Sequence, residues 1–198
     1  AEASESARAR PAEIGVVPVI AIENPRQCRF DPAVLECKGD DADTCLTMPQ
    51  VAALKKLYAG SVFPGYPPGG EAEPGGWEPW ITGAAPEKSL MFAFGTQFFK
   101  NMVFANPSWD FRTFDKDRDT KLTDTKMGPI LNAIDPDLSR FRARGGKLIL
   151  YHGWSDAAIA AGNAIDYYES VQAKMGANQA RGFVRLFMVP AMQHCNGG

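Results

Sequence analysis

The residues of this 198-residue sequence that could carry chemistry are an aspartate and a histidine near its carboxyl end. Asp156 closes the run Tyr151-His-Gly-Trp-Ser-Asp, and His194 stands before Cys195 in the run Val189-Pro-Ala-Met-Gln-His-Cys. A histidine paired with an aspartate accepts the proton of a serine hydroxyl, while the aspartate fixes its tautomer and stabilises the imidazolium. The two residues therefore predict two members of a nucleophile–base–acid triad.

The segments around these two residues predict two strands joined by a helix. Residues 147–152 form a short β-rich run, 162–175 have the apolar period of a helix, and 185–189 are again strand-like. A strand, a helix and a strand in this order form a crossover with parallel strands. Both following loops then leave the carboxyl edge of the sheet, where ligands bind in α/β proteins. Asp156 and His194 are therefore expected to meet there.

A triad also needs a nucleophile, and the sequence offers none. In α/β-hydrolases the chain order is nucleophile, acid, histidine, which would place the serine upstream of Asp156. No Gly-x-Ser-x-Gly motif occurs, and Ser155 shares the loop of Asp156, so it cannot face the histidine as a separate group. The second histidine, His152, lies at the end of the first strand and is expected to be a structural hydrogen-bond donor.

Several segments resemble the tannase and feruloyl esterase family. Three motifs near the carboxyl end carry the resemblance: Gly145-Gly-Lys-Leu-Ile-Leu-Tyr-His-Gly-Trp-Ser-Asp, Asn163-x-x-Asp-Tyr-Tyr-Glu, and the run from Arg185 to Cys195. Residues 24–32 and 45–51 resemble the start of the lid domain of that family. The resemblance implies an α/β-hydrolase fold with an inserted lid domain.

The resemblance also implies how the chain is divided. Residues 1–134 would be part of the lid domain, and residues 135–198 would be the C-terminal part of the catalytic sheet. The chain is expected to be incomplete at both ends. The nucleophile and the oxyanion hole would then lie on an upstream part of the same enzyme.

By the same resemblance, the intact protein would be a serine carboxylesterase that hydrolyses esters of aromatic acids. Asp156 would be the acid and His194 the base, and no catalytic cofactor would be needed. The intact protein would be secreted or periplasmic. One alternative is a non-catalytic binding protein, a pseudo-enzyme that kept the fold and lost the serine. Another keeps catalysis but divides the enzyme into two chains held together by Cys195.

The four cysteines carry further implications of the family. Cys37 and Cys45 bracket a short polar loop, and the family has a disulfide at this spacing; reduced thiols and a metal clip are the alternatives. Cys195 would be half of a bridge whose partner, the cysteine before the serine, is absent from this sequence. Cys28 has no identified partner. Disulfides form and persist in oxidising compartments, so such bridges would indicate a secreted or periplasmic protein.

Three residues are predicted to contact the substrate. Residues 61–86 are rich in Gly and Pro and predict an irregular loop whose Trp80 either stacks on an aromatic substrate or anchors the loop. The aromatic run 90–104 is typical of a core, but by resemblance it lines the pocket, with Phe98 as the first candidate. Ile159, on the same loop as Asp156, is the third candidate.

No metal site is predicted from the residues. The family implies a structural Ca²⁺ bound by an Asp-rich loop, yet the corresponding segment of this sequence offers only Glu13, and hard cations need several oxygens. Residues 115–119 resemble the start of an EF-hand, but Thr120 replaces the required glycine and Lys126 the required glutamate. These charges are expected to form a solvated turn.

Composition excludes two classes of partner. The sequence has 23 acidic and 21 basic residues, a formal net charge of −2 and no basic run, which argues against a nucleic-acid surface. No apolar stretch approaches the roughly 20 residues of a membrane span.

Two helix starts are visible outside the crossover. Thr47-x-x-Gln50 is a capping box that predicts a helix through Tyr58. The pair Asp135-Pro136 predicts the cap and first residue of a short helix that buries Phe141 and ends at Gly145.

Overall fold

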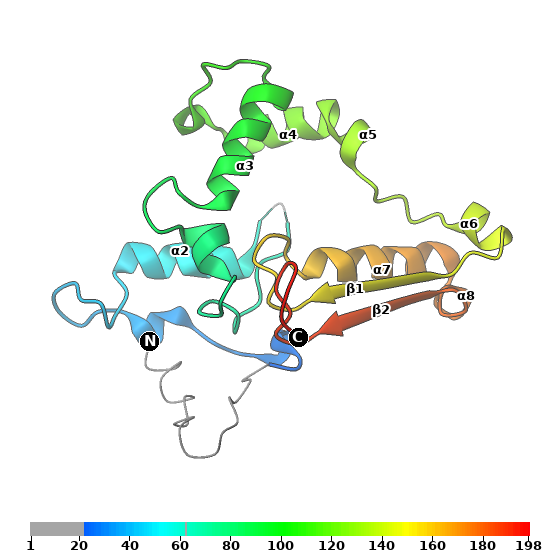
Figure 1. Ribbon diagram of the computed structural model, residues 1–198, viewed down its shortest axis with the longest axis horizontal. Helices are drawn as coiled ribbons and strands as arrows, with labels where there is room; N and C mark the ends of the chain where they lie inside the picture. The colour runs from blue at the N-terminus through cyan, green and yellow to red at the C-terminus, as the bar shows by residue number, and fades with distance from the viewer. Residues whose placement is uncertain (1–21, 62) are drawn as a thin grey trace.

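A computed structural model describes residues 22–61 and 63–198 of the chain. The sheet of this part has two parallel strands, β1 (Leu148–Gly153) and β2 (Val184–Val189), connected through helices α7 (Gly162–Met175) and α8 (Ala177–Ala180). Figure 1 shows α7 lying along the two strands. The segment in which Glu13 was considered as a calcium ligand lies outside the described residues.

The strand–helix–strand crossover predicted from the sequence is confirmed. The strands pair in parallel from Leu148 beside Val184 to Gly153 beside Val189. Val171 of α7 and Val184 of β2 are fully buried in the core, and Leu148 packs against them. Burying one such side chain contributes about 1.5–3 kcal/mol. The apolar face of α7 is therefore packed on the two strands and stabilises their pairing.

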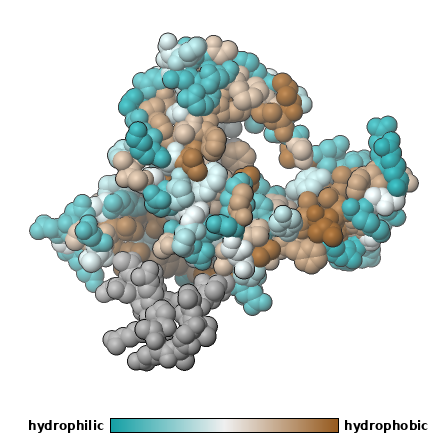
Figure 2. Space-filling view, in the orientation of Figure 1, coloured by the Kyte–Doolittle hydropathy of each residue, from teal (hydrophilic) through white to brown (hydrophobic). Residues whose placement is uncertain are grey.

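The opposite face of the sheet is apolar and exposed. Ile149 and Tyr151 are each 69% exposed, and Phe187 lies beside Tyr151 in the register. Because side chains alternate along a strand, these residues face away from α7. Figure 2 shows hydrophobic residues gathered over this two-stranded sheet.

The remaining helices are short and lie outside this core. They are the α-helices α2 (Met48–Ala59), α3 (Leu90–Phe98), α4 (Lys116–Lys126), α5 (Gly128–Leu131) and α6 (Ser139–Ala143). Single turns of 3₁₀-helix occupy Pro25–Gln27, Pro32–Leu35 and Phe111–Thr113, and turns of π-helix occupy Glu78–Thr82 and Phe99–Val103. Figure 1 shows α3, α4 and α5 as one group, joined to α6 by an extended segment. Of the helices described, none has the length and apolar character needed to span a membrane.

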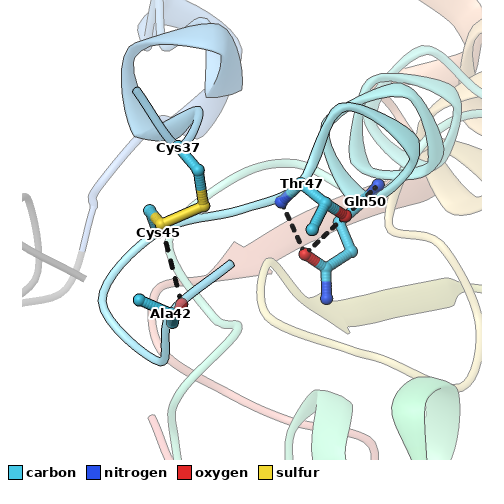
Figure 3. Close-up of a disulfide and its surroundings, with 5 residues drawn as sticks. All are labelled: Cys37, Ala42, Cys45, Thr47 and Gln50. Atoms are coloured by element: carbon cyan, nitrogen blue, oxygen red, sulfur yellow. Dashed lines mark hydrogen bonds between the residues drawn. A yellow bond between two sulfur atoms is a disulfide. The ribbon is translucent and has the colours of Figure 1, made fainter. Parts of the chain in front are cut away.

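The start of α2 has the cap that the sequence predicted, and a disulfide precedes it (Figure 3). The Thr47 side chain accepts from the Gln50 N–H, while Gln50 Oε1 accepts from the Thr47 N–H at 2.7 Å. Cys37 and Cys45 are bonded, with their Cα atoms 5.0 Å apart, which confirms the predicted disulfide. Closing so short a loop stabilises the fold by about 2–3 kcal/mol on the loop-entropy model.

The predicted solvated turn at residues 115–119 is wrong. Asp115 caps α4 by accepting from the Arg118 N–H at 2.8 Å, and Asp119 is fully buried in the first turn of that helix. Asp119 accepts from the Arg118 guanidinium and from the Asp115 N–H, and the Arg118 hydrogen bond holds the pKa of this carboxyl below its usual range. The charges therefore build a helix terminus.

The helix predicted to open at Asp135-Pro136 starts later, at Ser139. The reason is local: Asp135 Oδ1 accepts from the Asp137 N–H at 2.9 Å, and Asp137 Oδ1 accepts from the Ser139 N–H at 3.0 Å. Such side-chain turns compete with the first helical turn. Phe141 is also more exposed than predicted, although its ring lies 6.4 Å from that of Phe183.

The aromatic run 90–104 divides between two surroundings. Phe99 lies in a cluster with Phe104, Trp109 and Phe114, at centroid distances of 4.9–6.0 Å. Phe94 is 62% exposed and instead stacks on Trp80. Part of the run, around Phe99, therefore forms a packed aromatic cluster, while Phe94 is exposed beside Trp80.

Candidate functional site

The site is built from the two loops that follow β1 and β2. We call residues 154–161 the aspartate loop and residues 190–198 the histidine loop. Their backbones are joined where the strands end: the Trp154 N–H donates to Val189 O at 2.9 Å and the Ser155 N–H donates to Met192 O at 3.1 Å. Gly153 allows this approach, because a Cβ on it would lie 2.0 Å from Met192 O.

Asp156 and His194 meet at this edge of the sheet. His194 Nδ1 lies 3.1 Å from Asp156 Oδ2. An ionised carboxylate can only accept, so Nδ1 carries the proton and donates it, and Nε2 is left with a free lone pair. The His194 side chain is 33% exposed, whereas Asp156 is only 5% exposed. The predicted convergence is thus confirmed, and the catalytic roles of the two residues stay a prediction.

Three hydrogen bonds reach the Asp156 carboxylate, and the ring nitrogen of His152 lies close beside it. Oδ1 accepts from the Ala158 and Ile159 N–H groups at 2.8 and 2.9 Å, and Oδ2 lies 3.3 Å from His152 Nε2 as well as facing His194. Burial alone would raise the pKa of Asp156, but the hydrogen bonds from His152, Ile159, His194 and Ala158 lower it to about 2. Asp156 is therefore ionised across the neutral range.

His152 is the site residue that sequence reasoning did not place in contact with the pair. Its Nε2 lies 3.0 Å from Ile159 O, so its expected role as a hydrogen-bond donor holds, and it also reaches Asp156. The hydrogen bond to Asp156 raises the pKa of His152. The four-residue spacing was visible in the sequence, but the direction of the ring depends on the conformation of the aspartate loop.

The three predicted substrate contacts have different surroundings. The Trp80 ring meets the His194 ring edge-on at 5.0 Å and stacks on Phe94 at 6.3 Å. Ile159 is partly exposed beside Asp156. Phe98 instead lies against Phe99, within the aromatic cluster of the helix group. Phe94, one helical turn before Phe98, is the aromatic residue of this helix that supports Trp80.

The Gly- and Pro-rich segment 61–86 is fixed to the histidine loop. Gln193, which is 2% exposed, donates its side-chain amide to Glu73 Oε2 at 2.9 Å. Trp77 is buried against Tyr58 and Tyr66, with ring centroids 5.8 and 6.1 Å away. Trp77 thus anchors the segment, while Trp80 is presented to His194.

Two cysteines and two cavities are not part of the Asp156–His194 contact. Within the described residues Cys28 and Cys195 are unpaired, and Cys195 is exposed. A cavity of about 320 Å³ is lined by Tyr58, Tyr66, Trp154 and Asp166 among others, and one of about 580 Å³ by Gln27, Trp154 and Met188 among others. Neither includes Asp156 or His194 in its wall. In residues 22–61 and 63–198 no three metal-ligating side chains come together.

An ionised carboxylate that orients an imidazole at the carboxyl edge of parallel strands is the arrangement of the α/β-hydrolase class. The family model for tannase and feruloyl esterase matches residues 18–198. The chain is 40% identical to an uncharacterized esterase of Xanthomonas campestris pv. campestris and 34% identical to the mono(2-hydroxyethyl) terephthalate hydrolase of Piscinibacter sakaiensis. Each alignment covers 89% of this chain and 36% of the relative.

Solved structures agree with the sequence comparison. The crystal structure of feruloyl esterase B from Aspergillus oryzae matches 90% of this chain with a TM-score of 0.78 at 26% identity, over 36% of its own length. The chain belongs to the tannase and feruloyl esterase family. It spans about a third of the length of the curated relatives it matches.

Proposed function

We propose that the intact protein is a serine carboxylesterase in which Asp156 and His194 complete a triad with a serine on an upstream part of the same enzyme. The observation that carries this proposal is the hydrogen bond from His194 Nδ1 to Asp156 Oδ2, which leaves Nε2 as a proton acceptor. Membership of a family whose printed relatives are esterases supports it.

The proposed reaction proceeds in two proton-balanced halves. As the serine oxygen bonds to the ester carbonyl carbon, its proton passes to His194 Nε2, and ionised Asp156 stabilises the imidazolium. His194 then gives this proton to the departing alcohol, which leaves an acyl-enzyme. Water then attacks the acyl carbon and gives a proton to His194 Nε2, and His194 returns this proton to the serine oxygen as the acyl bond breaks and the acid leaves. This mechanism needs no cofactor.

We propose esters of aromatic acids as substrates. Trp80 stands beside His194 and is backed by Phe94, and offset or edge-on contact with such rings favours an aromatic acyl group. Partly exposed Ile159 would add an apolar contact next to the acid. Two relatives are named for feruloyl and terephthalate esters. Phe98 remains a predicted contact without a described link to the pair.

The architecture of the intact enzyme is part of the proposal. Residues 1–134 would belong to a lid domain, and 135–198 to the catalytic domain, with Trp80 carried by the lid. The bonded Cys37 and Cys45 support a secreted or periplasmic address, since disulfides persist in oxidising compartments. Exposed Cys195 would pair with a cysteine of the upstream part.

The test uses the intact enzyme and an aromatic ester such as methyl ferulate. His194→Ala should abolish turnover while the protein stays folded, and Asp156→Asn should lower kcat by about 10⁴-fold because the wrong histidine tautomer is favoured. Retained hydrolysis in His194→Ala would end the assignment. A wild-type protein that binds the ester without cleaving it would support the binding-protein alternative.

A further inference from the structure

We propose that His152 is a positioning residue of the esterase site, which holds the Asp156 carboxylate in the orientation that His194 requires. The inference rests on the function proposed above. It is carried by one nitrogen, His152 Nε2, which lies 3.0 Å from Ile159 O and 3.3 Å from Asp156 Oδ2.

The chemistry of its two partners fixes the tautomer of His152. A carbonyl oxygen and an ionised carboxylate oxygen can only accept hydrogen bonds. The proton must therefore sit on Nε2, in the neutral ring as well as in the cation. The Nε2–H of His152 is therefore hydrogen-bonded to Ile159 O and at the same time lies 3.3 Å from the Asp156 carboxylate.

The sharing matters because Asp156 has no spare acceptor. Its Oδ1 is satisfied by the Ala158 and Ile159 N–H groups, so the two imidazoles divide Oδ2 between them. Without His152, a carboxylate that is only 5% exposed would lose one of its donors. The carboxylate would then be held by the two N–H groups on Oδ1 and by His194 alone, so the position of Oδ2 would be less restricted.

His152 also closes the aspartate loop. Its ring projects from the end of β1 and binds the carbonyl of Ile159, while the N–H of Ile159 binds Oδ1 of the same aspartate. The hydrogen bonds thus form a ring that joins strand, loop and carboxylate. Two of these contacts, from the Ile159 N–H and from His152 Nε2, reach the carboxylate that faces His194.

The experiment compares three substitutions at residue 152 in the intact enzyme, assayed with methyl ferulate. His152→Gln places an amide N–H at nearly the reach of Nε2, whereas His152→Asn is one methylene shorter and His152→Phe has no donor. We expect kcat to fall about 10- to 100-fold in His152→Phe and His152→Asn, as for loss of one hydrogen bond to a charged group. KM should change less than about twofold, since only orientation in the transition state is lost.

His152→Gln should recover most of kcat, and this recovery separates donation from ring packing. Tyr151→Phe is the matched control, because Tyr151 is the neighbouring residue on the exposed face of β1 and should leave kcat unchanged. If His152→Phe does not fold, the Gln and Asn variants alone decide. Wild-type kcat in His152→Asn, or an equal loss in His152→Gln, overturns the proposal.

Failure of this inference and failure of the esterase function give different results. If His194→Ala is inactive and every residue-152 variant is fully active, only the role of His152 falls. If the wild type does not hydrolyse esters, the proposed function falls, and nitrogen NMR of the rings still tests the geometry. The His194 Nδ1–H signal should persist in His152→Gln and exchange rapidly with water in His152→Asn; equal exchange in both would reject the inference.

Discussion

Gln193 and Glu73, 120 residues apart in the chain, are joined by a 2.9 Å hydrogen bond from a buried amide to a carboxylate. The bond fixes the segment that carries Trp80 to the residue that precedes His194. Gln193 Oε1 has no partner among the described residues. The amide thus depends on Glu73 for the one side-chain bond that the described residues give it.

Glu73→Ala should therefore destabilise the protein and disturb the site. An unsatisfied buried amide costs about 1–3 kcal/mol, and kcat/KM for aromatic esters should fall because Trp80 and His194 are no longer held together. Denaturant unfolding and steady-state kinetics measure the two effects. Glu71→Ala is the control. Glu71 lies on the same segment as Glu73 and accepts a 2.6 Å hydrogen bond from Tyr58 of α2, so its loss should cost stability with little change in kcat.

Gly153→Ala should separate the aspartate and histidine loops. The added Cβ would lie 2.0 Å from Met192 O, so the backbone must move by more than an ångström. Activity should be lost, and the melting temperature should fall. Gly95→Ala is the matched control, since a Cβ there meets nothing within 4 Å and alanine favours a helix by about 1 kcal/mol. A fully active Gly153→Ala enzyme would contradict the described approach of the two loops.

The stability contributed by Asp156 should have a defined pH window. Its pKa is lowered from 3.8 to about 2, so this contribution is present above pH 4 and is lost as pH falls toward 2. The pKa of His152 is raised above 6.5 by the same carboxylate, so that contribution is present below pH 6.5 and is lost as pH rises through the folded pKa. The difference in melting temperature between wild type and Asp156→Asn should peak between these values. A difference independent of pH would refute both shifts.

Trp80→Ala should raise KM for aromatic esters about tenfold, the value of one aromatic contact, and leave an acetate ester unaffected. The specificity ratio between methyl ferulate and an acetate ester measures this effect. Phe94→Ala should reproduce part of it by removing the stacked support. Phe98→Ala tests the sequence prediction: an equal loss of specificity would place Phe98 in the pocket.

The sequence predicted the elements whose signals are local. The crossover follows from strand and helix periods within 147–189. Asp156 meets His194 because the loops that follow two parallel strands both lie at the carboxyl edge of the sheet. The start of α6 was misplaced because two aspartate side chains bind backbone N–H groups before it. Propensity rules do not weigh such competition.

The contacts that were not predicted join residues far apart in the sequence or depend on the conformation of a loop. The bond between Gln193 and Glu73 leaves no periodic trace in the sequence. The approach of His152 to Asp156 requires the turn in which Asp156 accepts from the Ala158 and Ile159 N–H groups. Phe94 and Phe98 lie one turn apart on α3, so their spacing could not decide which of them supports Trp80.

The fixed tautomer of His194 has a consequence for covalent labelling. Reagents such as diethyl pyrocarbonate acylate an imidazole nitrogen that has a free lone pair. In neutral His194 the free lone pair is on Nε2 of a side chain that is 33% exposed, whereas in His152, which is protonated at Nε2, it is on Nδ1 of a side chain that is only 16% exposed. Carbethoxylation followed by mass spectrometry should therefore mark one histidine of the two well before the other, and the order of modification reports which ring faces the solvent.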